Sequence, residues 1–164
     1  MDKEQLLALV EEGFHKPAWH GPNLRSALRG VTPEEAVWRP AGGRHNIWEI
    51  AVHAAYWKYA VTQRLTGSKN HDFPEKGRNW FVRDESKLAK GEVANRWKSD
   101  LGLLARTHRG LCDAIAEIKE QDLMRPMRGS RQTAIRNIVG IAMHDIYHAG
   151  QIQMLRKLYG SRVR

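Results

Sequence analysis

The stretch NIWEIAVHAAYWKYAVTQRLTG, residues 46–67, decides the fold class of this chain. Its apolar side chains recur every three or four positions, which is the spacing of one face of an α-helix. Asn46 suits the N-cap, Glu49 follows three residues later as in a capping box, and Gly67 is a common helix stop. The stretch therefore predicts one long amphipathic helix. Its inward face would consist of Ile47, Ile50, Ala54, Trp57, Val61 and Leu65.

Three further segments have the same helical spacing, from residue 2 to about 14, from about 91 to 120, and from about 133 to 159, where Gly160 would end the last helix. A shorter helix is expected to begin at Thr32, which suits an N-cap. We find no strand-like alternation of apolar and polar residues, and no internal repeat. The sequence therefore predicts an all-α four-helix bundle.

Residues 67–90 form a long polar connection between the second and third long helices. Loops of this length in a compact domain usually cross the domain or carry function, so we expect a long crossover here. Its aromatic residues Trp80 and Phe81 are expected to be exposed. A chain of 164 residues suits one core, and we expect a single helical-bundle domain over residues 1–164.

The last helical segment contains MHDIYHAGQIQ, residues 143–153, in which His144 and His148 are four residues apart. The two imidazoles lie on one helix face, one turn apart, and can converge on one ion. The alternative is a pair of histidines that bond to carbonyl groups or lie at the surface. The stretch is not a zinc-protease motif, because Asp145 replaces the required Glu and no downstream ligand follows His148.

A third ligand must come from earlier in the chain, and His53 is the best candidate. It lies on the inward arc of the second helix, between Ile50 and Trp57. Side chains of facing helices meet in the core of a bundle. Three histidines leave coordination positions open, as metal catalysis requires, whereas structural sites are closed. The alternative is a metal-binding protein without catalysis, in which another side chain fills those positions.

Three stretches resemble the DinB-like (YfiT-like) family, and with the overall length they cover most of the chain. The specific combination is a histidine early in the second helix together with H-x-x-x-H-x-G-Q in the fourth. The stretches are AWHGPNLRSALRGVTPEEA (18–36), RHNIWEIAVHAAYWK (44–58) and HDIYHAGQIQMLRK (144–157).

This resemblance implies a bundle of up-down-down-up topology, which the long connection fits. It also implies one divalent metal ion, nickel, zinc or iron, held by His53, His144 and His148. Characterised members of the family include transferases and isomerases that use low-molecular-weight thiols. The expected function is therefore metal-dependent thiol transfer or isomerisation of a small-molecule substrate, with a metal-bound water or thiol as the reactive group. Hydrolysis, and metal binding without catalysis in a stress response, remain alternatives. The resemblance, together with the expected exposure of Trp80 and Phe81, also favours a homodimer.

Further residues are expected near the site, as pocket lining or as partners of the ligands. Asp145 lies about 100° around the helix from His144, so we expect it to accept a hydrogen bond from a histidine N–H or from an arginine. Glu49 would do the same or only cap its helix, and His20 would line the pocket, add a ligand or cap a helix. The full set is His20, Glu49, Trp57, Asp145, Tyr147 and Gln151, of which Trp57 and Tyr147 would otherwise pack in the core. The histidines without a spacing partner are expected to be structural or exposed: His15, His45, His71 and His108.

The composition is that of a globular chain, with 41% hydrophobic and 27% charged residues. No apolar run is long enough to cross a membrane, and the N-terminus lacks the pattern of a secretory signal, which favours a cytoplasmic protein. The one cysteine, Cys112, excludes an internal disulfide and is expected to pack as a small apolar residue. The net charge of +9 alone suggests nucleic acid, but no groove-reading motif accompanies it, which speaks against that partner.

Overall fold

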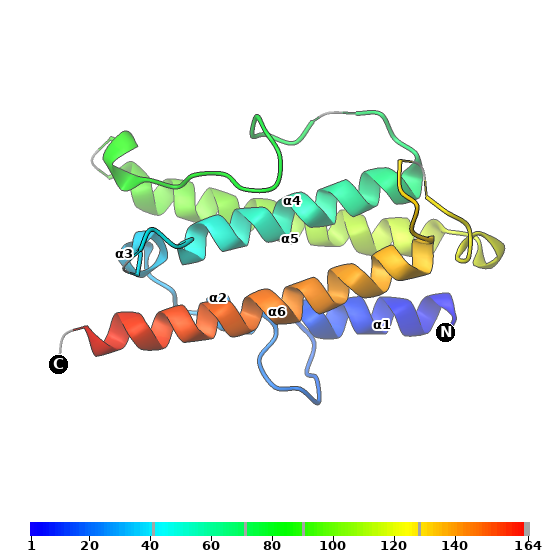
Figure 1. The fold of residues 1–164 in the computed structure, drawn as a ribbon, viewed down its shortest axis with the longest axis horizontal. Helices are drawn as coiled ribbons and strands as arrows, with labels where there is room; N and C mark the ends of the chain where they lie inside the picture. The colour runs from blue at the N-terminus through cyan, green and yellow to red at the C-terminus, as the bar shows by residue number, and fades with distance from the viewer. Residues whose placement is uncertain (41, 71, 90, 128, 163–164) are drawn as a thin grey trace.

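The chain is all-helical over the residues that the computed structural model describes, which are 1–40, 42–70, 72–89, 91–127 and 129–162. The α-helices are α1 (Lys3–Phe14), α2 (Leu24–Leu28), α3 (Pro33–Val37), α4 (Ile47–Thr66), α5 (Glu92–Glu117) and α6 (Ala134–Ser161), and two short 3-10 turns are η1 (Glu85–Lys87) and η2 (Glu120–Asp122). The four long helices lie side by side along the long axis of the molecule (Figure 1). This confirms the predicted helical class.

Polar side chains start five of the six α-helices, because they accept hydrogen bonds from backbone N–H groups that the helix leaves unpaired. The caps are Asp2, Asn23, Thr32, Asn46 and Thr133. The predicted end of α4 at a left-handed glycine is also found, with φ 68° at that position. The prediction that α6 ends at Gly160 is wrong, because the helix continues through Gly160 to Ser161. A glycine inside a helix costs only about 1 kcal/mol relative to alanine.

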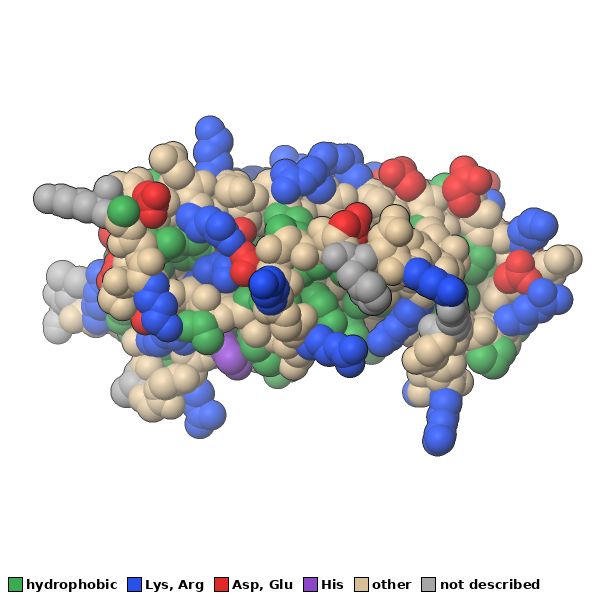
Figure 2. Space-filling view, turned by 90° about the horizontal axis from the view of Figure 1, so that it is seen from above, with side chains coloured by type: hydrophobic (Ala, Val, Ile, Leu, Met, Phe, Trp, Pro, Cys, Tyr) green, Lys and Arg blue, Asp and Glu red, His purple; other side chains and the backbone are tan. Residues whose placement is uncertain are grey.

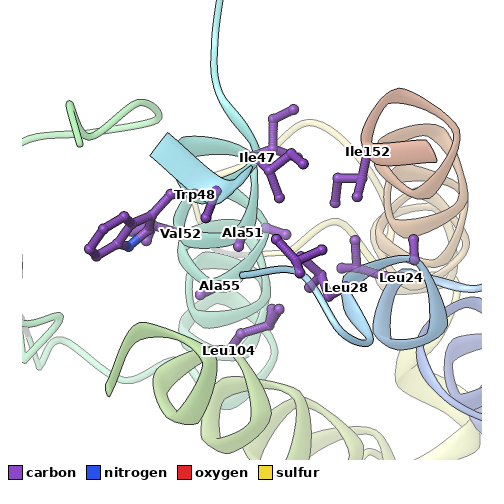
Figure 3. Close-up of a cluster of buried hydrophobic side chains, with 14 of the residues drawn as sticks. Leu24, Leu28, Ile47, Trp48, Ala51, Val52, Ala55, Leu104 and Ile152 are labelled. Carbon is purple, nitrogen blue, oxygen red and sulfur yellow. The ribbon is translucent and has the colours of Figure 1, made fainter. Parts of the chain in front are cut away.

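The core lies between the inward faces of the long helices and the short α2. Figure 3 shows one cluster, in which side chains of α4 meet Leu24 and Leu28 of α2, Leu104 of α5 and Ile152 of α6. The predicted inward face of α4 is buried at four positions and half-buried at Trp57 and Leu65. None of the described helices is both long and apolar enough to span a membrane.

The connection between α4 and α5 runs back along the bundle, from the end of α4 to the start of α5 (Figure 1). Arg83 anchors it. Its backbone N–H donates to Glu49 Oε1 at 2.9 Å and its Nε donates to Asp100 Oδ2 at 2.8 Å. The prediction that Trp80 and Phe81 are exposed is therefore wrong, since the anchored segment folds against α4, leaving Phe81 5% exposed and Trp80 half-buried.

Candidate metal centre

Three histidines converge at the middle of the bundle. His53 comes from α4, and His144 and His148 come from successive turns of α6. His144 Nε2 lies 3.0 Å from His53 Nε2 and 3.1 Å from His148 Nε2. His53 and His148 are buried, and His144 is half-buried. The structure thus brings together the three histidines that the sequence singled out, in a group that could hold a metal ion.

Hydrogen bonds to the Nδ1 atoms determine the tautomer of two of these imidazoles. His53 Nδ1 lies 2.7 Å from the backbone oxygen of Asn79, and His148 Nδ1 lies 2.7 Å from Gln151 Oε1. Because both partners are acceptors, each Nδ1 carries the proton and each Nε2 presents a lone pair. The single Nε2–H that His144 can supply satisfies only one of these lone pairs. A cation at the centre would satisfy all three rings, and oxygen acceptors behind histidine ligands are the usual arrangement at metal sites.

Burial keeps the three imidazoles neutral, because removing a ring from water disfavours its charged form. It lowers the pKa of His144 to about 3 and the pKa of His148 to about 4, and it lowers the pKa of His53. The neutral ring is the form that binds metal ions. The cluster is therefore ready to accept a cation at neutral pH without first losing protons.

Lowering the pH from 6.5 to 4.5 is expected to destabilise the metal-free protein. Burial lowers the native pKa values of His108 and His144 to about 3 and that of His148 to about 4, so in this range the unfolded chain binds protons that the native protein does not. Each contributes a loss of up to about 1.4 kcal/mol per pH unit. Burial raises the pKa of Asp145 to about 6. Native Asp145 therefore takes up a proton in this range before the unfolded chain does, and this gain in stability offsets the loss from one histidine. Urea unfolding at several pH values measures the slope.

The slope should become shallower in His148→Gln protein and stay unchanged in His20→Gln protein, since His20 is exposed. A free energy of unfolding that does not fall over this pH range would show that the buried histidines are not held neutral.

The crossover supplies two contacts that the sequence did not reveal. Asn79 adopts φ 70°, a left-handed conformation that asparagine tolerates better than most residues. It accepts from His53 through its backbone oxygen and from Trp57 Nε1 through its side-chain oxygen at 2.8 Å. The Trp80 indole stacks between His53 and His45, with ring centroids 3.8 and 3.6 Å away. The crossover thus orients His53 and covers one face of its ring.

Glu49 supports this arrangement from behind, without touching the three histidines. Its buried carboxylate accepts from the Arg39 guanidinium, from the Arg83 backbone N–H and from His45 Nδ1 at 3.0 Å. Burial alone would raise the pKa of Glu49, but these hydrogen bonds hold it below its ordinary value. The expected link from Glu49 to a histidine is therefore made to His45, which in turn stacks on Trp80.

Asp145 pairs with a residue that the sequence analysis passed over. It was expected to accept from a histidine or an arginine, but its Oδ2 binds the ammonium of Lys58, and both side chains are 0% exposed. Burial raises the pKa of Asp145 to about 6, although the Lys58 charge opposes this. The pair ties α4 to α6 next to His144. The position of Lys58 among the apolar residues of the stretch 46–67 is a sequence signal for a buried lysine that needs an acidic partner.

The remaining candidates lie at or outside the edge of the cluster. Tyr147 is 63% exposed, and its hydroxyl accepts from Gln151 Nε2 at 2.9 Å. Gln151 is half-buried and holds His148, as described above. His20 is exposed and is not part of the converging group, and Asn23 caps α2 in its place. His71 lies outside the described residues.

A pocket of about 250 Å³ opens beside the cluster. His144, Trp57, Arg64 and Arg136 are among its lining residues. Arg64 donates to Asn137 Oδ1 at 3.2 Å and lies 5.7 Å from the centre of the Trp57 ring. The pocket therefore offers positive charge and an aromatic surface close to His144.

Comparisons with known proteins bear on the family and the fold of this chain. A sequence model described as the DinB superfamily matches residues 18–152. Among solved structures, the crystal structure of the colibactin self-resistance protein ClbS in complex with a double-stranded DNA is similar, with a TM-score of 0.62, 20% sequence identity, and coverage of 95% of this chain and 96% of that chain. At this identity the likeness shows the fold alone. No curated protein matches the sequence.

Proposed function

Because the chain belongs to the DinB superfamily, we propose that it is an enzyme that holds one divalent metal ion through His53, His144 and His148. The proposed reaction is thiol-dependent transfer or isomerisation of a small-molecule substrate. The observation that carries the metal site is the convergence of three Nε2 atoms, 3.0 and 3.1 Å from the central one, with two of the outer nitrogens held by oxygen acceptors. Nickel, zinc and iron all accept three imidazoles.

We also propose that residues 1–164 form one domain of up-down-down-up topology. The course of the ribbon supports this order, because α4 and α5 point the same way along the long axis while α1 and α6 point the other way (Figure 1). The crossover between α4 and α5 is what permits two consecutive long helices to be parallel.

The metal supplies one thing that these side chains lack. When bound, a divalent ion would lower the pKa of a coordinated water or thiol, so that a nucleophilic anion is available near neutral pH. The side chains of the protein orient the ligand rings and exclude water. Asn79 and Gln151 hold two of the ligand rings, and the indoles of Trp57 and Trp80 limit the access of water to the cluster.

The pocket beside His144 suits a thiol that carries a carboxylate. A guanidinium group forms charge-assisted hydrogen bonds to carboxylates, and Arg64 and Arg136 both line the pocket. The wall formed by Trp57 would contact the apolar part of such a molecule. We therefore propose a low-molecular-weight thiol with at least one carboxylate as the sulfur donor.

The test is consumption of thiols by metal-loaded protein with several electrophiles. A thiol that bears a carboxylate is expected to react faster than an uncharged thiol of similar size. Replacing Arg136 by Gln is expected to raise the KM for the charged thiol about tenfold, which is the value of one charge-assisted hydrogen bond, and to leave the KM for the uncharged thiol unchanged.

Arg131→Gln is the matched control, because Arg131 is exposed and lies outside the pocket. No thiol consumption with any electrophile, in protein that retains metal, would favour the alternative of metal binding without catalysis. Reaction with water alone would favour hydrolysis.

A second candidate function is DNA binding, although the sequence contains no groove-reading motif. The similar protein ClbS was crystallised with double-stranded DNA, and this chain carries a net charge of +9. Figure 2 shows lysine and arginine side chains spread along the whole face seen from above, with acidic side chains between them. Duplex binding that weakens steeply with salt and survives removal of the metal would favour this candidate.

The homodimer remains a proposal on new grounds. The predicted exposure of Trp80 and Phe81 no longer supports it. In their place, α6 presents exposed apolar side chains at helical spacing on one face. These are Met143, Tyr147, Met154 and Leu158.

A further inference from the structure

A second and larger cavity lies away from the histidine cluster. It has a volume of about 770 Å³ and lies between the end of α1, the short helix α2 and the middle of α5. It shares no lining residue with the pocket beside His144. Its size is that of a typical small-molecule site. We call it the arginine cavity, after Arg25, Arg29 and Arg109 in its lining.

The three arginines of this cavity have no carboxylate partner among the described residues. Arg39, Arg83, Arg96, Arg125 and Arg156 are each paired with an acidic side chain. Those that line the arginine cavity form no such pair, and no aspartate or glutamate lines the cavity. Exposed unpaired guanidinium groups around a concave surface create a positive potential that attracts anions.

His108 provides an independent sign of a missing partner. It lines the cavity and is 4% exposed, with its ring stacked 3.9 Å from that of Phe14. Its Nε2 lies 3.5 Å from Cys112 Sγ, and its buried Nδ1 has no hydrogen-bond partner in the described part of the chain. Burial raises the pKa of the Cys112 thiol to about 11. The thiol therefore keeps its proton and can donate a hydrogen bond to Nε2. In that tautomer Nδ1 is an N–H donor without an acceptor.

A buried donor without an acceptor is costly. Nδ1 is enclosed by the protein, so an oxygen atom of a ligand would reach it after the His108 ring turns toward the cavity. The imidazole itself stays neutral, because burial lowers the pKa of His108 to about 3. The interaction is thus a hydrogen bond to an oxygen and not an ion pair. The charge on the ligand would be met by the arginines instead.

Part of the remaining lining is apolar and includes small residues, while His15, Asn23 and Ser26 add polar groups. Gly102 and Ala105 line it on the α5 side. A Cβ at Gly102 would meet only the end of the flexible Arg106 side chain, at 3.3 Å, so helix packing does not require this glycine. The apolar walls are formed by Phe14, Leu28, Val31, Leu101 and Leu104. A ligand there would be charged at one end and apolar over the remainder.

We propose that the arginine cavity is a second binding site, for a small amphiphilic anion with a carboxylate or phosphate head group and an aliphatic or aromatic body. The head group binds Arg25, Arg29 and Arg109, and the body packs on the apolar walls. This site is separate from the proposed metal centre and does not depend on it.

The test is isothermal titration calorimetry with octanoate, octyl phosphate, inorganic phosphate and 1-octanol. At least one of the two amphiphilic anions is expected to bind, and to bind at least tenfold more tightly than inorganic phosphate and 1-octanol. The stronger of the two identifies the head group. The double substitution Arg25→Gln/Arg109→Gln is expected to weaken that binding at least tenfold.

Lys98→Gln/Arg131→Gln is the matched control, since it removes the same charge from exposed positions outside the cavity. It should bind as the unmodified protein does, and so should His148→Ala protein, which separates this site from the metal centre. The proposal is overturned if neither anion binds, if 1-octanol binds equally well, or if the Arg25→Gln/Arg109→Gln protein keeps full affinity.

Discussion

Protein carrying His148→Ala is expected to bind a divalent ion at least about a hundredfold more weakly than the unmodified protein. Loss of a group that only orients a ligand typically costs 10–100-fold in affinity, and His148 is proposed as a ligand itself. The substitution also removes the partner of His144 Nε2 at 3.1 Å. Elemental analysis of untagged protein and competition with a coloured chelator measure the loss.

The control is His20→Ala, which removes an exposed histidine that is not part of the cluster. It should bind the ion as the unmodified protein does, and this outcome would also dismiss His20 as an extra ligand. Unchanged metal content in His148→Ala protein would contradict the proposed site. Gln151→Ala should have an intermediate effect, because it removes only the acceptor behind His148 Nδ1.

Replacing Lys58 by Met is expected to destabilise the metal-free protein by about 3–5 kcal/mol, the cost of leaving one member of a buried ion pair alone. Lys58 and Asp145 are both 0% exposed, and no hydrogen-bond donor reaches Asp145 Oδ1 among the described residues. Urea unfolding at pH 7.5, above the Asp145 pKa of about 6, measures the deficit.

A second substitution separates charge from packing. The double variant Lys58→Met/Asp145→Leu should recover much of the lost stability, because no uncompensated charge remains. The deficit of the single variant should shrink as the pH falls, since a protonated Asp145 carries no charge. A single variant that is destabilised by less than about 1 kcal/mol would mean that water reaches the pair, because exposed ion pairs contribute only this much.

The sequence predicted most of what local interactions determine. The periodicity of α4 and its Asn46 cap predicted a helix that the structure places at Ile47–Thr66. Spacing alone put His144 and His148 on one face of α6. His53 followed from its place on the inward arc and from the lack of any ligand after His148. These inferences need only the helical repeat and the rule that facing helices share a core.

The parts that the sequence did not reveal depend on contacts between distant segments. Asn79 and Trp80 contact the site because Arg83 anchors the crossover to α4 and α5, and no periodic pattern encodes this. The burial of Lys58 depends on Asp145, 87 positions later. The sequence shows no second histidine at helical spacing from His108. Its neighbour in the structure is instead Cys112, one helical turn away, whose thiol contacts the ring.

The orientation of His53 by the crossover couples two equilibria. The ring keeps its position only while the backbone oxygen of Asn79 lies 2.7 Å from Nδ1, so ordering of this segment and capture of an ion must favour each other to the same extent. Amide hydrogen exchange around residue 80 should therefore slow when the ion binds. By the same reciprocity, a molecule that bound the outer surface of the crossover and ordered it would raise the affinity of the centre for the metal ion without contacting any histidine.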